Sequence, residues 1–279
     1  MLHFADLPGT RLLDPEARPA NTPSVPSRNL VYEVLALRSK ETPAGTRVLT
    51  MLSAESGLVD AFVFGGPKSK LRSLASPWGA GRAFLYHDPV RDYMKLSDFE
   101  VIRPFSGLRE NLRRILSASL VAELLIKTSG GGGDFARVLA MSLDCLGALE
   151  ELPEARADYP LLLFIWRLVE LIGILPETES CALCGRDIGE GESRSWMPRE
   201  GGFACPDCRP EEGDGEEAPR LSAGALKWLA RAQGLGSLQA AAVGLDQRSR
   251  AGLRRLCFGL AREAVEGPLE SLASGIGVL

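Results

Sequence analysis

Two pairs of cysteines are the residues of this chain best suited to chemistry. They form two CxxC motifs, Cys181-Ala-Leu-Cys184 and Cys205-Pro-Asp-Cys208, with 20 residues between them. Four thiolates can surround a zinc ion tetrahedrally, and a two-residue spacing lets paired sulfurs converge while amides of the turn donate to them. Because four protein ligands leave no position open for a water molecule, the spacing predicts a structural zinc site rather than a catalytic one.

Three other uses of these cysteines are weighed against zinc. Two disulfides need an oxidising compartment, and the N-terminal stretch MLHFADLPGTRLLDPEARPANTPSVPSRN has none of the features of a signal peptide, which favours a cytoplasmic protein. A thioredoxin-like redox pair needs only one CxxC, in a βαβ setting. An iron–sulfur cluster also takes four thiolates, but paired motifs at this spacing favour zinc. Cys145 and Cys257 lie in apolar helical patterns and are expected in the core.

The composition argues for a binding protein rather than an enzyme. The chain has 279 residues, a net charge of −4, 45% hydrophobic and 24% charged residues, which is typical of a globular protein of about two domains. It has two histidines, His3 and His87, which are too few for a histidine-rich metalloenzyme and argue against a Ser/His/Asp hydrolase. Arg167 and Glu170 interrupt the most apolar run, residues 161–175, so no membrane association is expected.

The elements that must position these residues follow from the hydrophobic pattern. Five β-branched or aromatic runs predict strands at residues 30–38, 46–53, 57–64, 82–87 and 93–102, with a short helix at 69–78. That order is typical of an OB-fold barrel. Beyond residue 108 apolar residues recur every three or four positions and predict helices, with Asp134, Ser222 and Asp246 as N-caps. The predicted fold class is α+β: a five-stranded OB-fold barrel, then an α-helical domain that carries a four-cysteine zinc ribbon.

These elements divide the chain into five segments. We expect a flexible extension at 1–28, the OB-fold domain at 29–104, a first helical part at 105–180, the zinc ribbon with an acidic insert at 181–220, and a second helical part at 221–279. Residues 1–104 carry a net charge of +2 and residues 221–279 a net charge of +3, whereas residues 151–220 carry −9. The overall acidity therefore masks a mildly basic barrel.

A glycine-rich segment after the third predicted strand, GGPKSKLRS, concentrates positive charge. Paired glycines allow a close backbone approach, and clustered cations can neutralise phosphates. Further cations flank the first turn of the barrel and the start of the helical part. The candidate DNA-contacting residues are Lys68, Lys70, Arg72, Arg38, Lys40, Arg47, Arg109, Arg113 and Arg114, and Arg250 and Arg254 form a similar pair near the C-terminus. Each of these cations taken alone is better explained as an ordinary solvated charge, and it is their clustering that favours DNA contact.

Aromatic residues on the predicted strands have two interpretations. Tyr32, Phe62, Phe64 and Tyr86 can stack on nucleic-acid bases, but most of them are expected to fill the barrel core. The tract Gly130–Gly133 is not a phosphate-binding Walker loop, because no Gly-Lys-Ser/Thr follows it, and it is expected to be a flexible helix connection.

The chain resembles the bacterial RecO family of recombination mediators. The resemblance rests on LVYEVLALRSKE and TRVLTMLSAESGLVDAFVFGGPKSKLRS in the barrel, on AELL in the first long helix, and on LFIWRLVELIGILPETESCALCGRD and GGFACPDC around the ribbon. It covers the chain from about residue 29 onward. Where that family has arginines after the third strand, this chain has Phe64 and Pro67, so the cationic positions that carry over are Lys68, Lys70 and Arg72.

The resemblance implies a protein that binds single- and double-stranded DNA, anneals complementary strands and helps load the RecA recombinase at single-stranded gaps. It implies RecR and the C-terminal tail of single-stranded DNA-binding protein as partners, RecA as an indirect partner, and a nucleoid-associated, cytoplasmic location. Two other functions stay open. One is a metal-dependent nuclease or hydrolase, for which the chain lacks histidines. The other is a non-catalytic protein-interaction scaffold with a structural zinc ribbon.

Overall fold

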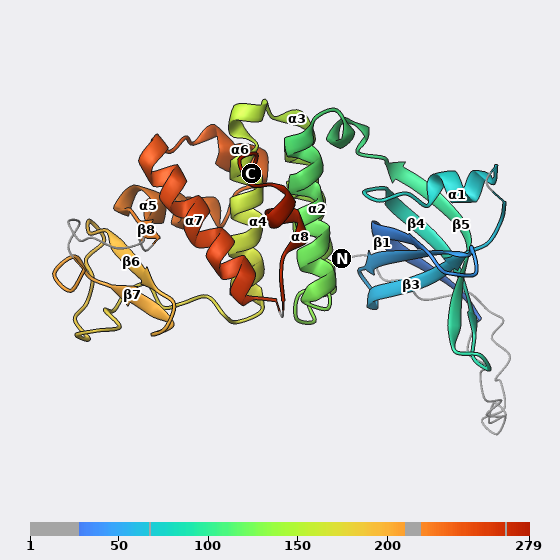
Figure 1. The fold of residues 1–279 in the computed structure, drawn as a ribbon, viewed down its shortest axis with the longest axis horizontal. Coiled ribbons are helices and arrows are strands. Elements are labelled where there is room, and N and C mark those ends of the chain that lie inside the picture. Colours follow the sequence, from blue (N-terminus) through green and yellow to red (C-terminus); the bar gives the residue numbers. More distant parts are fainter. Residues whose placement is uncertain (1–27, 67, 210–218, 266) are drawn as a thin grey trace, which may run out of the picture.

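Three bodies follow one another along the long axis of the protein (Figure 1). The computed structural model describes residues 28–66, 68–209, 219–265 and 267–279. A β-barrel lies at one end, a helical bundle in the middle, and a small β-ribbon at the other end. The predicted flexible extension, apart from residue 28, and most of the predicted acidic insert lie outside the described residues.

The barrel has the predicted strand order. Its elements are β1 (Asn29–Glu41), β2 (Arg47–Ser53), β3 (Gly57–Val63), α1 (Lys70–Leu74), β4 (Ala80–Asp88) and β5 (Tyr93–Arg103). The sheet closes in the order β1-β2-β3-β5-β4. All neighbouring strands pair antiparallel except β3 and β5, which are parallel. The five predicted strands and the helix between the third and fourth are therefore confirmed.

Alternation along the strands separates the barrel core from its outer surface. Leu49 and Met51 of β2, and Ala61 and Val63 of β3, are at most 1% exposed and point inward. They pack with Phe99 of β5 in a core of their own. Because successive side chains of a strand point to opposite faces, the residues between them form the outer surface of the barrel.

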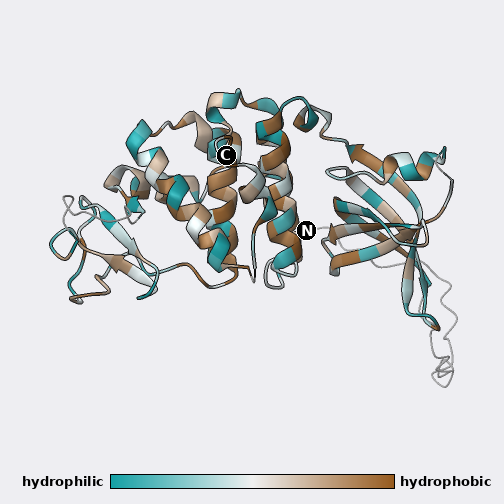
Figure 2. Ribbon diagram, in the orientation of Figure 1, coloured by the Kyte–Doolittle hydropathy of each residue, from teal (hydrophilic) through white to brown (hydrophobic). Residues whose placement is uncertain are grey.

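The helical bundle is built around one buried helix. Its elements are η1 (Ser106–Arg109), α2 (Leu112–Lys127), α3 (Phe135–Glu151), η2 (Glu154–Arg156), α4 (Asp158–Leu171), α5 (Ala223–Ala232), α6 (Ser237–Ala242), α7 (Gln247–Glu263) and α8 (Glu270–Ser274). Helix α4 is buried over ten of its fourteen residues and packs against α3, α6 and α7. Figure 2 shows it as largely hydrophobic, in agreement with the apolar run in the sequence.

The predicted caps start three of these helices. The side chains of Asp134, Ser222 and Asp246 each accept a hydrogen bond from a backbone N–H in the first turn of α3, α5 and α7. Helices α6 and α8 were not predicted. They are six and five residues long, too short for a periodic pattern to appear.

The glycine tract forms the turn between α2 and α3, with Gly130 and Gly131 buried and Gly132 and Gly133 exposed. All four glycines, Gly130–Gly133, have positive φ angles. A Cβ on Gly131 would lie 2.9 Å from Cγ2 of Val138 and 3.0 Å from Cδ1 of Leu168. Glycine is required there because both the backbone conformation and the approach of α3 and α4 exclude a side chain.

The ribbon is a three-stranded sheet tied to the bundle. Strands β6 (Arg194–Met197), β7 (Gly202–Ala204) and β8 (Arg220–Leu221) pair in the order β7-β6-β8. The rings of Trp196 and Phe203 pack with their centroids 5.3 Å apart. Since β8 packs against α7 and leads into α5, the ribbon is anchored to the bundle from its C-terminal side. Within the described ranges, no helix is both long and apolar enough to cross a bilayer.

Candidate metal centre and nucleic-acid face

The four predicted metal ligands meet in the ribbon. The Sγ atoms of Cys181, Cys184, Cys205 and Cys208 all lie within 4.8 Å of one another. Those of Cys184 and Cys205 are 3.9 Å apart. A tetrahedral zinc with Zn–S bonds of about 2.3 Å would hold its sulfurs about 3.8 Å apart, so the four thiols fit such an ion.

Backbone amides favour the thiolate form of Cys181 and Cys205. The amide of Cys205 donates to the Sγ of Cys181 at 3.3 Å. Burial alone would raise the pKa of Cys181, but amides of Cys205, Cys184 and Leu183 outweigh it and lower the pKa to about 6. A lowered pKa favours the thiolate, which is the form that binds metals, whereas hydrogen bonds to the neighbouring thiols raise the pKa of Cys208.

An arginine links the two cysteine motifs from outside. The guanidinium of Arg186, two residues after Cys184, lies 2.9 Å from Glu192 and 2.9 Å from Asp207, which stands inside the second CxxC motif. The contact with Asp207 joins the segment after the first CxxC motif to the second motif. Cys145 and Cys257 are fully buried in the helical core, as predicted, and burial raises the pKa of both thiols.

A row of side chains crosses the outer face of the barrel over four strands. Lys40 of β1 pairs with Val48 of β2, Val48 with Phe62 of β3, and Phe62 with Lys95 of β5. Directly paired residues point to the same face, and strands lie about 4.8 Å apart, so the row spans roughly 14 Å. We call Lys40, Val48, Phe62 and Lys95 the cationic row.

Aromatic rings extend this row. The ring of Phe62 lies 6.2 Å from that of Phe64 at 26° and 5.6 Å from that of Tyr93 at 89°. The Nζ atom of Lys95 lies 5.7 Å from the centre of the Phe64 ring. Phe64 is 46% exposed, so a base can reach part of its ring.

The other two aromatic candidates lie elsewhere on the barrel. Tyr32 is half-buried against the barrel core. The hydroxyl of Tyr86 accepts a hydrogen bond of 3.5 Å from Arg28. Both are on the paired strands β1 and β4, outside the cationic row.

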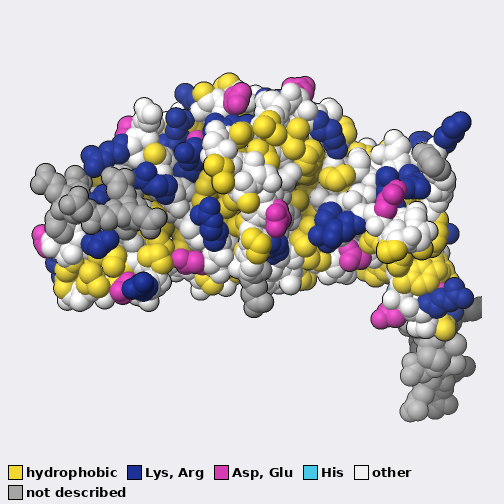
Figure 3. Space-filling model, in the orientation of Figure 1, with side chains coloured by type: hydrophobic (Ala, Val, Ile, Leu, Met, Phe, Trp, Pro, Cys, Tyr) yellow, Lys and Arg dark blue, Asp and Glu magenta, His cyan; other side chains and the backbone are white. Residues whose placement is uncertain are grey.

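The three cations after β3 divide into two kinds. Lys68 and Lys70 are exposed and form no ion pair with any residue that the structure describes. Arg72 is instead held by an ion pair with Glu41 and donates to the carbonyl of Gly65 at 3.2 Å. Figure 3 shows Lys and Arg side chains at this end of the barrel, near α1.

The cations flanking the first turn also divide. The Nη1 of Arg47 donates to the carbonyl of Arg72 at 2.9 Å, so this side chain connects β2 to α1. Arg38 is exposed and pairs with Thr50 of β2, whose hydroxyl donates to Asp60 at 2.6 Å. Arg38 therefore lies on the same outer face as the cationic row, two residues along β1 from Lys40.

The arginines at the start of the helical part are not brought to this face. Each of them is bound by other groups of the chain. Arg109 donates to the carbonyl of Pro77 at 2.6 Å. Arg113 donates to the carbonyl of Val278 at 2.7 Å and lies 3.4 Å from Asp158, and Arg114 donates to the carbonyl of Leu152 at 3.1 Å and lies 3.0 Å from Glu110. Arg109 also lies over the ring of Trp78 at 5.0 Å.

The second predicted arginine pair is likewise divided. Arg250 donates to the carbonyl of Ala155 at 2.9 Å, whereas Arg254 is half-buried on α7. For all these arginines DNA contact stays a prediction.

Two residues of the barrel face were missed in the sequence. Lys95 is an isolated lysine, and Tyr93 stands at the start of a strand after a turn. Their alternation with buried Leu96 indicates an outward position, but only the pairing of β5 with β3 brings them to Phe62.

Comparisons with known proteins agree with this architecture. A family model described as "Recombination protein O C terminal" matches residues 109–273. The DNA repair protein RecO of Anaeromyxobacter sp. (strain Fw109-5) is 34% identical over 211 residues, covering 75% of this chain and 80% of that protein. The DNA repair protein RecO of Rubrobacter xylanophilus is 30% identical over 203 residues, covering 70% and 78%.

The family match covers more than half of the chain, and its range includes both CxxC motifs and most of the helical bundle. The relatives cover about three quarters of the chain at 30% identity or more. The chain therefore belongs to the RecO family of DNA repair proteins.

Proposed function

We propose that this protein is a non-catalytic, DNA-binding recombination mediator that anneals complementary strands and helps load the RecA recombinase at single-stranded gaps. The observation that carries this proposal is the cationic row, with Phe64 and Tyr93 packed beside Phe62. Lys68 and Lys70 follow Phe64 in the chain and enlarge the same positive end of the barrel.

The chemistry of this face suits single-stranded DNA. Lysines attract phosphates at any sequence, and a base stacked on an aromatic ring is bound whatever its identity. In OB-fold barrels the face of the second and third strands, with the loops beside it, is the usual oligonucleotide site. A mediator that acts at any gap requires such sequence-independent contacts.

We propose that the four cysteines hold a structural zinc ion. Zinc at Cys181, Cys184, Cys205 and Cys208 would supply folding free energy to the ribbon and no catalytic chemistry, because its coordination is complete. The thiolate character of Cys181 and the sulfur spacing support this assignment.

The proposed partners follow from family membership. They are single- and double-stranded DNA, RecR, the C-terminal tail of single-stranded DNA-binding protein and, indirectly, RecA, at the nucleoid. Support comes from the match to DNA repair proteins named RecO over most of the chain.

An annealing assay with two fluorescently labelled complementary strands tests the proposal. At low salt the protein should accelerate annealing. Phe64→Ala should weaken binding to single-stranded DNA by about 1–3 kcal/mol, the usual contribution of one stacked base. Lys40→Ala/Lys95→Ala should lower both affinity and its salt dependence.

Arg82→Ala is the matched control, because Arg82 is an exposed cation of β4 that is paired with Glu100. If the protein does not accelerate annealing and the row variants bind like the wild type, the proposal is wrong. Retained binding of RecR with salt-insensitive or absent DNA binding would favour the alternative of a protein-interaction scaffold.

A further inference from the structure

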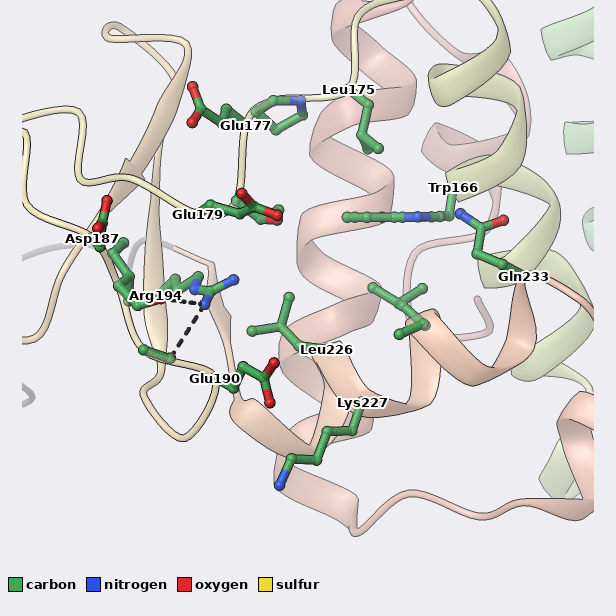
Figure 4. A pocket seen from close by; sticks show the side chains of 16 residues that line it. Trp166, Leu175, Glu177, Glu179, Asp187, Glu190, Arg194, Leu226, Lys227 and Gln233 are labelled. Carbon is green, nitrogen blue, oxygen red and sulfur yellow. Dashed lines mark hydrogen bonds between the residues drawn. The ribbon is translucent and has the colours of Figure 1, made fainter.

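A pocket lies where the ribbon meets the helical bundle (Figure 4). The barrel is on the opposite side of the bundle (Figure 1). The volume of the pocket is about 810 Å³. The floor is apolar: Trp166 comes from α4, and Leu226 and Leu229 come from α5. Leu175 and Ile188 line it from the linker and from the loop after the first CxxC motif. The pocket can therefore bury an apolar side chain.

The rim of this pocket is acidic. Glu177, Glu179, Asp187 and Glu190 line it and are exposed, and none of them has an ion-pair partner among the described residues. Two cations also line the pocket, Lys227 at its edge and Arg194 inside it. The rim thus attracts positive groups and repels phosphates and carboxylates.

A buried arginine supplies the second, independent observation. Arg194 is 6% exposed, and its guanidinium is turned into the space between Glu179 and Leu226 (Figure 4). Its Nη2 donates to the carbonyls of Ile188 and Gly189 at 3.0 and 3.3 Å, whereas its Nε has no hydrogen-bond partner among the described residues. The Nε is closed off from solvent, whereas Nη1 makes no hydrogen bond to a described residue, so a ligand carbonyl at Nη1 would give this guanidinium a further acceptor.

We propose that this pocket binds an extended peptide segment of a partner protein in which an apolar residue is flanked by lysines or arginines. The apolar side chain would pack on Trp166, Leu226 and Leu229, and the flanking cations would pair with the rim carboxylates. A main-chain carbonyl of the peptide would accept from Arg194. The inference is independent of the proposed DNA function, because none of these residues belongs to the barrel.

Fluorescence anisotropy with three dye-labelled hexapeptides tests this inference on the full-length protein with its metal. The peptide KRLLKR should bind. KRGGKR, which keeps the charge and lacks the apolar centre, and EDLLDE, which keeps the centre and reverses the charge, should each bind at least about tenfold more weakly. Tighter binding of EDLLDE, or equal binding of KRGGKR, would overturn the proposal.

Variants separate this pocket from general attraction to an acidic protein. Glu179→Lys/Asp187→Lys should weaken KRLLKR binding by about tenfold, since it replaces two favourable contacts by repulsion. Glu154→Lys/Glu200→Lys makes the same change of net charge at exposed sites that do not line the pocket and should bind normally. Equal loss in both pairs would show non-specific binding and refute the pocket assignment.

A cross-linking experiment locates the peptide directly. With a diazirine-bearing leucine at the centre of KRLLKR, mass spectrometry should find adducts on residues 175–190 or on α5. Adducts confined to other segments would contradict the proposal. If the charge-reversal variant does not fold, Leu226→Lys on the half-buried pocket wall replaces it, with the same expected loss of KRLLKR binding.

Discussion

In the segment after β3, residue type alone does not reveal what a cation does. Lys68 and Lys70 face solvent, while Arg72 is 13% exposed and is bonded to Glu41 and to the carbonyl of Gly65. The same sequence pattern therefore contains two side chains free to meet phosphate and one that shapes the loop. No feature of the sequence separates them, because Glu41, the partner of Arg72, lies on β1, 31 positions earlier in the chain.

The two kinds of cation should behave differently on substitution. Lys68→Ala/Lys70→Ala should reduce the slope of log affinity against log salt for single-stranded DNA, by about 0.7 for each phosphate that is no longer neutralised. Arg72→Ala should instead lower the thermal midpoint and leave most of that slope intact, because its guanidinium already has partners. An Arg72→Ala protein of normal stability with a reduced slope would contradict this division.

Cys184 is the most accessible of the four proposed ligands and gives a direct test of the metal. Cys184→Ser should release zinc and lower the free energy of unfolding by several kcal/mol, since metal affinity at such a site, about 10–16 kcal/mol, is folding free energy. Atomic emission spectrometry measures the bound zinc, and thermal melts measure the loss of stability. Cys257→Ala is the control: it should also destabilise, through a buried cavity, yet retain the metal.

At the level of helices and strands, the N-cap residues allowed the starts of three helices to be predicted from the sequence. Asp134, Ser222 and Asp246 could be recognised because an N-cap acts on its own first turn, within three residues. Helix α8 could not, because it is held by a residue almost 150 positions away. Glu123 of α2 accepts hydrogen bonds from the backbone amides of Glu270 and Ser271 at 2.8 and 2.9 Å.

This clamp predicts a pH dependence. Burial by itself would raise the pKa of Glu123, but the amides of Ser271 and Glu270 outweigh it and hold the pKa below its ordinary value of 4.5. A carboxylate with a lowered pKa in the folded state stabilises that state above about pH 4.5, and the contribution is lost as the pH falls through the lower, folded value.

Hydrogen exchange of the α8 amides measures this effect. Glu123→Gln should speed their exchange at neutral pH by an amount corresponding to about 1 kcal/mol and should remove the additional acid sensitivity below about pH 4.5. Glu110→Gln, at an exposed carboxylate that pairs with Arg114, is the matched control. An unchanged exchange rate in Glu123→Gln would show that packing alone holds α8.

At the level of the whole molecule, the sequence predicts the order of the bodies but not their shared surfaces. Strand order, helix periodicity and CxxC spacing are local patterns, and the structure agrees with all three. The cationic row and the ribbon pocket each combine residues from several elements. Lys40 and Lys95 are 55 positions apart and meet one face only through the pairing of β2 and β3 between them.

The separation of barrel and ribbon predicts that removing the metal leaves DNA binding intact. The barrel interior is a hydrophobic core distinct from that of the bundle and ribbon, and the two structures lie at opposite ends of the protein (Figure 1). A zinc chelator should therefore melt the ribbon in circular dichroism while affinity for single-stranded DNA stays the same. A parallel decrease of both signals would show that the bodies are coupled through α4.

The barrel closes at the place where the cationic row is completed. Strands β3 and β5 are joined by only two residue pairs, Ala61 with Met94 and Phe62 with Lys95, whereas β1 and β2 share seven. The seam of the barrel therefore runs through the middle of its proposed DNA face. A DNA strand that stacks on Phe62 and binds Lys95 would connect β3 to β5. The backbone amides of these two β-strands should therefore exchange more slowly in the complex with DNA.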